Sequence, residues 1–343
     1  MLGWRSKREF LQAGRLGRLI NDAMTIHTRK SDIAAGCAPI PEDASRLLFL
    51  GPGCAWRVNG SCDAGHLLTR ITEVMALPPV GEGGYPRMLF TRCDPGCAVC
   101  SAWVTGAAAG DGSHERWRPM DLPYLRMWTF PGTPGLLCQL RHWDNAISDT
   151  ARIKAALNPV YMNVIAHDGF PIHGGLIQYE GKGVILAGHG DVGKTTACTR
   201  ILHPFQARSD DETTIVCDQG RVFAHPMPTW SSCENGRPLG STFLHPRIPL
   251  VAVCFLKQSP EIRLSPMGQG QAAVRMHQSA WETLSTYTFF QHGSNRDHFR
   301  QQVFDNACRV ARQIPAFTLH LSLTGDFWTP LRRMIRSDGE GVI

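Results

Sequence analysis

The sequence of 343 residues contains no long apolar run, no block of like charge and no internal repeat. No apolar stretch approaches the roughly 18 consecutive residues that a membrane-spanning helix needs, which argues against an integral membrane protein. The basic opening, residues 1–8, is not followed by the apolar block and small-residue cleavage site of a secretory signal. We therefore expect a soluble, cytoplasmic protein without a membrane partner.

Charge is modest in amount and evenly distributed. Charged residues make up 19% of the chain, and 35 Lys and Arg against 29 Asp and Glu give a net charge of +6. Because the basic residues form no cluster along the chain, the sequence predicts no nucleic-acid partner. It predicts only a slight preference for anionic ligands.

The length favours two domains of roughly 100–200 residues each. Residues 1–44 are polar and basic, and we expect this segment to be partly disordered. Residues 45–145 combine short strand patterns with one helical pattern, which predicts a small α+β domain that could recognise a peptide. Its expected elements are strands at 47–50 and 55–58, a turn at Asn59–Gly60 and a helix at 66–77.

Residues 146–343 have the pattern of a mixed α/β nucleotide-binding domain. A strand at 175–179, a tight turn at 180–183 and a strand at 184–187 predict a hairpin that leads directly into a glycine-rich loop. A doubly wound nucleotide fold would reach this loop from a parallel strand instead. The other expected elements are helices at 146–164, 271–289, 295–313 and 326–335, a second hairpin of strands 213–217 and 221–224, and strands at 250–256 and 317–323.

The glycine-rich loop has the spacing Gly-x4-Gly-Lys-Thr of a phosphate-binding loop, between an apolar strand and a helix. Glycines allow successive backbone N–H groups to turn toward one anion, and the helix directs its positive dipole end at the same point. We expect Lys194 to reach the β- and γ-phosphates of ATP or another nucleoside triphosphate. The predicted nucleotide-binding residues are Gly188, His189, Gly190, Asp191, Val192, Gly193, Lys194, Thr195 and Thr196.

Carboxylates follow this loop at short range, in Asp210, Asp211 and Glu212. A nucleotide-bound Mg²⁺ needs oxygen ligands, and transfer to a hydroxyl group benefits from a base that accepts its proton. We therefore assign Asp210, Asp211 and the Thr195 hydroxyl to the metal, and the two aspartates to proton transfer. The alternative is a solvated acidic turn, which is common in proteins.

Two histidines and a tryptophan are further candidates. His173 precedes the first hairpin strand and would lie beside the glycine loop if the two strands pair. His225 and Trp230 follow the second hairpin, in a proline-stiffened segment that could contact the acceptor. A structural or packing role is the alternative for each of them.

These residues together resemble the C-terminal domain of HPr kinase/phosphorylase, whose fold is related to PEP carboxykinases. The order His173-Gly174, hairpin, glycine loop with Lys194 and then Asp210-Asp211 carries the resemblance, which is close over residues 172–223. It implies that His173, Lys194, Asp210 and Asp211 form the active site, and it implies a homo-oligomer.

A longer series of motifs resembles the HPr-kinase-like proteins of peptide-modification clusters, of the SynChlorMet cassette ScmC type. The series comprises Pro171 to Gly174, Gly188 to Thr196, Asp210 to Glu212 and His225 to Ser231, and the resemblance extends over most of residues 46–331. It implies a kinase that uses ATP and Mg²⁺ to phosphorylate a Ser, Thr or Tyr hydroxyl of a ribosomal precursor peptide (RiPP pathway). The alternatives are a nucleotide-binding module that presents a peptide to a partner enzyme, and a kinase for a small molecule such as free serine.

Twelve cysteines are present, and three have the spacing Cys93-x3-Cys97-x2-Cys100. The same spacing holds the iron–sulfur cluster of radical enzymes, but the parallel barrel of those enzymes is not predicted here. Local packing is the favoured interpretation, and structural zinc with Cys62, His66 or His114 as fourth ligand is the alternative.

Overall fold

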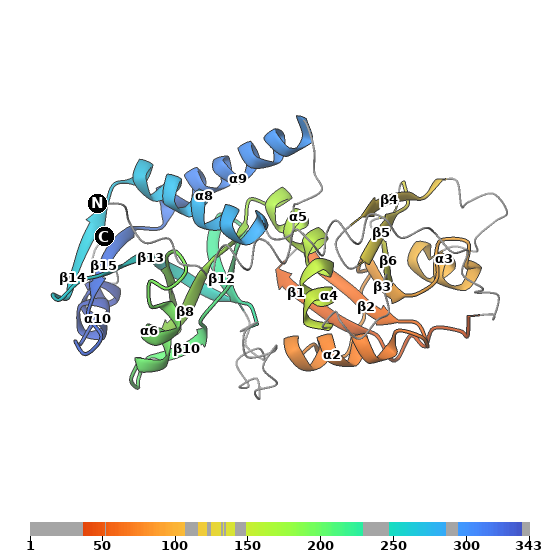
Figure 1. The fold of residues 1–343 in the computed structure, drawn as a ribbon, viewed down its shortest axis with the longest axis horizontal. Coiled ribbons are helices and arrows are strands. Elements are labelled where there is room, and N and C mark those ends of the chain that lie inside the picture. Colours follow the sequence, from red (N-terminus) through yellow and green to blue (C-terminus); the bar gives the residue numbers. More distant parts are fainter. Residues whose placement is uncertain are drawn as a thin grey trace, which may run out of the picture. The chain divides into compact units, whose positions relative to one another are not determined.

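The computed structural model describes residues 37–51, 53–106, 116–121, 125–131, 133, 135–140, 149–228, 247–285 and 294–337 (Figure 1). Residues 37–343 form one compact unit. Of the segment 1–44 for which we expected partial disorder, residues 1–36 lie outside the described part. No helix in the described ranges combines the length and the apolar character needed to cross a bilayer.

The first of two sheets has six strands in the order β1-β2-β3-β6-β5-β4, with parallel pairing of β2 to β3 and of β3 to β6. Its other neighbours are antiparallel. The elements are β1 (Arg46–Gly51), β2 (Cys54–Gly60), α2 (Gly65–Met75), β3 (Arg87–Thr91), α3 (Ala98–Thr105), β4 (Arg118–Asp121), β5 (Leu125–Thr129) and β6 (Leu136–Leu140).

The turn predicted at Asn59–Gly60 is wrong, because both residues belong to strand β2. The buried Asn59 amide donates to Pro41 O at 2.7 Å and to Ser45 Oγ at 3.0 Å. These long-range bonds fix Asn59 in the sheet, whereas its local turn preference assumes contacts with its own neighbours.

The second sheet has nine strands, and seven of them follow the order β10-β8-β9-β13-β12-β11-β7, with β15 beside β13 and β14 beside β15. It is mixed, since β9 pairs antiparallel with β8 and parallel with β13. The elements are α4 (Asp149–Ala156), α5 (Asn158–Ala166), β7 (Phe170–Ile172), β8 (Gly174–Tyr179), β9 (Lys182–Ala187), α6 (Lys194–Arg200), β10 (Gln206–Ser209), β11 (Thr213–Asp218), β12 (Arg221–Pro226), β13 (Ile248–Gln258), β14 (Arg263–Met267), α8 (Gln269–Ser285), α9 (Ser294–Gln313), β15 (Ala316–Leu321) and α10 (Trp328–Ser337).

Both predicted hairpins, β8–β9 and β11–β12, are confirmed. The first turns through Glu180 and Gly181, whose φ angles of 48° and 77° are those of a type I′ turn. The turn type matches the right-handed twist of the paired strands, and glycine accepts the left-handed backbone at little cost.

The helix predicted over 146–164 is instead two helices, α4 and α5, separated by Leu157. Pro159 lies in the first turn of α5. Proline has no N–H to donate to the carbonyl four residues earlier, and its ring collides with that carbonyl. A continuous helix is therefore interrupted there, and residues 146–148 lie outside the described part.

The nine-stranded sheet is buried on both faces. On β8 and β9, Leu176 and Ile185 pack into one core with α8 and α9, whereas Ile177 and Leu186 pack into a second core with α6 and α10. Figure 1 shows α8 and α9 side by side, and both contact β7. The first core also contains Leu48 and other residues of the six-stranded sheet, so one set of apolar side chains serves both sheets.

Candidate functional site

The site forms at two short connections, at residue 173 and at residues 210–212. Each joins a strand near one end of the strand order to a strand near the other end. A single residue, His173, separates β7 from β8, although β7 is the last strand of the order and β8 is the second. Residues 210–212 connect β10, which pairs with β8, to β11, which pairs with β7. The sheet must therefore curl until both connections run beside each other.

Hydrogen bonds hold the two connections together. The Thr213 hydroxyl donates to Gly174 O at 2.8 Å and lies 3.0 Å from Ser209 Oγ. Ser209 Oγ in turn accepts the backbone N–H of Leu176 at 3.1 Å. Because Ser209 and Thr213 flank residues 210–212, these bonds fix the acidic segment against the start of β8.

The glycine-rich loop connects the end of β9 to helix α6, in the predicted order of strand, loop and helix. Gly193 caps the helix with a φ angle of 103°, which a side chain would strain. Within the described part of the chain, the backbone N–H groups of Gly190, Asp191 and Gly193 have no carbonyl partner. They are available to an external acceptor such as an anion.

Lys194 is buried and directs its ammonium group back onto the same loop. Its Nζ donates to Gly188 O at 2.8 Å and to His189 O at 2.9 Å. Burial lowers the pKa of Lys194, against the opposing influence of Asp211, Glu282 and Asp191. A buried cation that is bonded to loop carbonyls in this way can turn to an incoming phosphate without losing a salt bridge.

His173 lies between two carboxylates at the mouth of this loop. Its Nε2 is 3.5 Å from Asp211 Oδ1, and its Nδ1 is 3.7 Å from Glu282 Oε2. Glu282 also accepts from His189 Nδ1 at 2.5 Å. Since β8 residue Gly174 pairs with Ala187 just before the loop, the expected proximity of His173 to the glycine loop is confirmed.

Asp211 is ionised in this environment. Burial opposes the charge, but the hydrogen bond and charge of His173, together with Lys154 and Lys194, hold the pKa of Asp211 below its ordinary value. A carboxylate that stays ionised next to cationic groups is suited to accepting a proton or coordinating a cation.

Asp210 occupies a different environment from its neighbour. It lies close to Cys198 of α6, where its charge adds to the effect of burial in raising the pKa of that thiol to about 12. A methyl group at Gly175 would come within 3.1 Å of Asp210 Cα and 2.5 Å of Cys198 Sγ. The absence of a side chain at Gly175 therefore allows the chain at Asp210 to pass close to α6.

Thr195 and Thr196 lie in the first turn of α6 with exposed side chains. Their position beside the loop is the predicted one. Glu212 points elsewhere: its side chain is buried, and its carboxylate accepts the hydroxyl hydrogen of Tyr161 on α5. Glu212 therefore has a structural partner in the protein interior. It is not part of a solvated acidic turn, which was the alternative considered for this segment.

The Tyr161–Glu212 contact gives a stability prediction. Replacing Tyr161→Phe removes a donor from a buried carboxylate and should lower the free energy of unfolding by about 2 kcal/mol, measured by urea denaturation. Tyr179→Phe is the matched control, because that hydroxyl meets the solvent-exposed Arg336. Equal losses in both variants would contradict the structural assignment of Glu212.

His225 lies on β12, two strands away from β7. Burial lowers its pKa to about 4, and its Nδ1 lies 2.9 Å from Pro226 O, to which it donates. It is therefore neutral at pH 7, with one ring nitrogen already bonded. Trp230 lies outside the described residues.

Two charged residues of this site were not predicted from the sequence. Glu282 belongs to α8, where the preceding turn also supplies Ser279, whose hydroxyl donates to His173 O at 3.2 Å. Residues three apart share one face of a helix, so α8 holds both the backbone and the ring of His173. The other residue is Lys154 of α4, which acts on Asp211. Both were assigned to helices, but a helical period does not reveal which distant loop a side chain meets.

The cysteine triplet lies on the six-stranded sheet. Cys93 follows β3, Cys97 caps α3 and Cys100 lies in the first turn of that helix. The structure brings Cys37 to them, so that the four sulfur atoms lie within 4.8 Å of one another. The fourth ligands considered earlier, Cys62 and His66, do not belong to this group, and His114 lies outside the described residues.

The second half of the chain matches a known protein family. The family model of the SynChlorMet cassette protein ScmC matches residues 136–336, which is more than half of the chain. The matched range extends from β6 into α10 and includes His173, the glycine loop, Asp211 and Glu282. No curated protein matches the chain.

Proposed function

We propose that this chain, which belongs to the SynChlorMet cassette ScmC family, is an HPr-kinase-like phosphotransferase that moves the γ-phosphoryl group of ATP to a hydroxyl group. One observation carries the proposal. Lys194, His173 and Asp211 converge on the end of a hairpin-fed glycine loop, with a carboxylate and an imidazole 3.5 Å apart. Phosphoryl transfer to an alcohol can use a lysine and loop amides to bind the phosphates and a carboxylate to accept the proton of the hydroxyl group.

The loop supports a triphosphate donor. The N–H groups of Gly190, Asp191 and Gly193, which have no backbone carbonyl partner in the described ranges, and the start of helix α6 provide positive partial charges close together in the chain. In this proposal Lys194 releases the carbonyls of Gly188 and His189 and binds the β- and γ-phosphates.

A divalent cation fits the same residues. Carboxylate and hydroxyl oxygens are the ligands that Mg²⁺ prefers, and the ionised Asp211 and the exposed Thr195 hydroxyl supply them, with Asp210 as a further candidate. When bound, Mg²⁺ would neutralise charge on the phosphates. We assign no such role to Glu212, since Tyr161 occupies its carboxylate.

The transfer itself needs one proton acceptor. In our proposal the acceptor hydroxyl donates its proton to Asp211 while its oxygen attacks the γ-phosphorus. The bond from that phosphorus to the β,γ-bridging oxygen breaks, and ADP leaves with the electron pair. His173 holds the Asp211 carboxylate in position, and Lys194 and the loop amides stabilise the negative charge on the transferring group.

We further propose that the acceptor is a Ser, Thr or Tyr residue of a ribosomal precursor peptide. Support comes from the family, whose name places its members in a cassette, and from the six-stranded sheet, five of whose strands precede the matched region. Its edge strand β4 is largely exposed and could pair with an extended peptide.

A direct assay tests the proposal. The full-length chain is incubated with Mg²⁺, γ-labelled ATP and a panel of Ser-, Thr- and Tyr-containing peptides, with free serine in parallel. Label on a peptide, located by mass spectrometry, is the expected result. Label on free serine alone would assign a small-molecule kinase, and hydrolysis without transfer to any acceptor would support a peptide-presenting module instead.

Glu282 offers a finer prediction. In Glu282→Gln the side chain keeps its shape but loses the charge that faces His173 and His189, so both rings lose an ionic partner. We expect kcat to fall about tenfold, equivalent to about 1.4 kcal/mol, with unchanged nucleotide affinity by calorimetry. Glu261→Gln, at an exposed position between β13 and β14, is the control. A wild-type kcat in Glu282→Gln would remove Glu282 from the site.

A further inference from the structure

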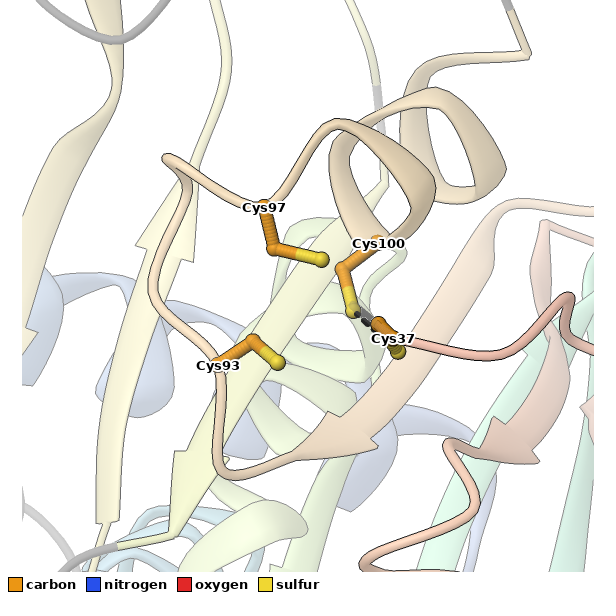
Figure 2. Close-up of side chains that lie close together, drawn as sticks. All are labelled: Cys37, Cys93, Cys97 and Cys100. Carbon is orange, nitrogen blue, oxygen red and sulfur yellow. Dashed lines mark hydrogen bonds between the residues drawn. The ribbon is translucent and has the colours of Figure 1, made fainter. Parts of the chain in front are cut away.

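Four cysteines converge on one point of the six-stranded sheet, outside the family-matched range. They are Cys37, Cys93, Cys97 and Cys100, and their sulfur atoms all lie within 4.8 Å of one another. Figure 2 shows the four side chains directed toward a common centre, one from the segment at Cys37 and three from the connection between β3 and α3. We propose that this group binds one zinc ion as a structural site with four thiolate ligands.

The sulfur spacing suits a single metal ion. With zinc–sulfur bonds of roughly 2.3 Å, the sulfur atoms of a tetrahedral site lie about 3.8 Å apart. Cys37 Sγ and Cys100 Sγ are 3.7 Å apart. An iron–sulfur cubane lies between its four thiolates and holds them further apart, so the geometry favours one ion over a cluster. The same distance is far from the roughly 2.05 Å of a disulfide.

The backbone around the group is fixed independently of any metal. Thr91 Oγ1 accepts the N–H of Cys93 at 3.0 Å and contacts Cys100 Sγ at 3.6 Å. The Asp94 carbonyl accepts the N–H of Cys97, and the Cys97 carbonyl accepts that of Ser101. Three of the four ligands are therefore held on one short strand-to-helix connection, which is the arrangement of a preformed site.

The surroundings indicate a structural role. Cys93 and Cys100 are buried, and Cys37 and Cys97 are half-buried, at the border of a small apolar cluster that includes Trp103 and Trp117. Four protein ligands complete the tetrahedron and leave no position for a substrate. The ion would tie the segment at Cys37 to the connection between β3 and α3, whose Cys100 lies 63 positions further along the chain.

Metal analysis of the full-length chain tests this inference. Protein that is expressed with added zinc and purified without chelator should contain about one zinc per chain. Cys37→Ser and Cys97→Ser should lose it. Cys62→Ser is the matched control: Cys62 is exposed and is not part of the group, so this variant should keep the full content. After exchange for cobalt, the spectrum should show the thiolate charge-transfer bands of a tetrahedral site.

Cysteine alkylation of the wild-type protein is a second test that does not depend on the folding of variants. Cys37 and Cys97, which are half-buried, should resist alkylation until a chelator is added, whereas Cys62 should react in both conditions. Equal reactivity of Cys37 and Cys97 with and without chelator would overturn the inference. So would a disulfide among the four residues, iron with sulfide in place of zinc, or full zinc content in Cys37→Ser. None of these readouts depends on kinase activity.

Discussion

Asp211→Asn should reduce phosphoryl transfer about a thousandfold while leaving nucleotide affinity within about threefold of wild type. Asparagine keeps the shape of the side chain and its contact with His173, but an amide cannot accept the proton of the acceptor hydroxyl. The two effects separate because the proton acceptor acts in the transferring step, while the donor is held mainly by the glycine loop. Initial rates with labelled ATP and calorimetric titration with a non-hydrolysable analogue measure them.

The control for this variant is Asp168→Asn. Asp168 has a positive φ angle of 67°, which asparagine tolerates, and its carboxylate pairs with Arg309 at 2.9 Å. We expect wild-type rates.

Because the pKa of Asp211 is lowered, the carboxylate is already ionised above about pH 5, so kcat/KM should show no acid limb from this group between pH 5 and 8. Transfer in Asp211→Asn at more than a tenth of the wild-type rate would exclude Asp211 as the proton acceptor.

Lys194→Met should abolish measurable transfer and also weaken nucleotide binding, which distinguishes it from Asp211→Asn. Methionine can occupy the buried path of the lysine stem, but it supplies no charge to the β- and γ-phosphates. Loss of one such electrostatic partner costs about 10²–10³ in rate. Single-turnover kinetics and calorimetry would report both losses.

Lys182→Met provides the matched control. Lys182 begins β9, at the end of that strand opposite the glycine loop, and its Nζ bonds Ile335 O of α10. We expect a small change in thermal stability and no change in nucleotide affinity. If Lys194→Met bound ATP as tightly as Lys182→Met, the glycine loop would not be the nucleotide site.

The sequence predicted those parts of the fold that depend on neighbouring residues. Alternating apolar residues around the Glu180–Gly181 turn identified the first hairpin, because strand period and turn chemistry are both local. From that hairpin the position of His173 beside the loop followed directly. Asp211 could be placed near the same point because it follows the glycine loop and its helix at short range, with only residues 201–210 between the end of α6 and Asp211.

Contacts between distant segments could not be predicted in this way. Glu282 meets His189 across 93 positions, and its helix α8 carries no motif that distinguishes Glu282 from other exposed acids. The part played by Cys37 was harder still to predict, because this residue lies in a segment without regular structure before β1. From the triplet spacing we favoured local packing and kept a zinc site only as the alternative, because the fourth cysteine depends on how the amino-terminal segment returns to β3, which single-sequence patterns do not encode. The turn predicted at Asn59 was wrong for the same reason, since the hydrogen-bond partners of its side chain are 14 and 18 residues away.

The shared core has a consequence for how this protein can be divided. The family match begins at residue 136, which is also the first residue of β6, and β6 is an interior strand between β3 and β5. The boundary of sequence similarity therefore runs through the six-stranded sheet. A fragment that begins at residue 136 would contain β6 without either of its neighbouring strands. It would also expose apolar side chains that Leu48 and other residues of the first half cover. The matched range thus shares its apolar core with strands that lie outside it, so we expect the fragment 136–336 to be insoluble when it is expressed alone.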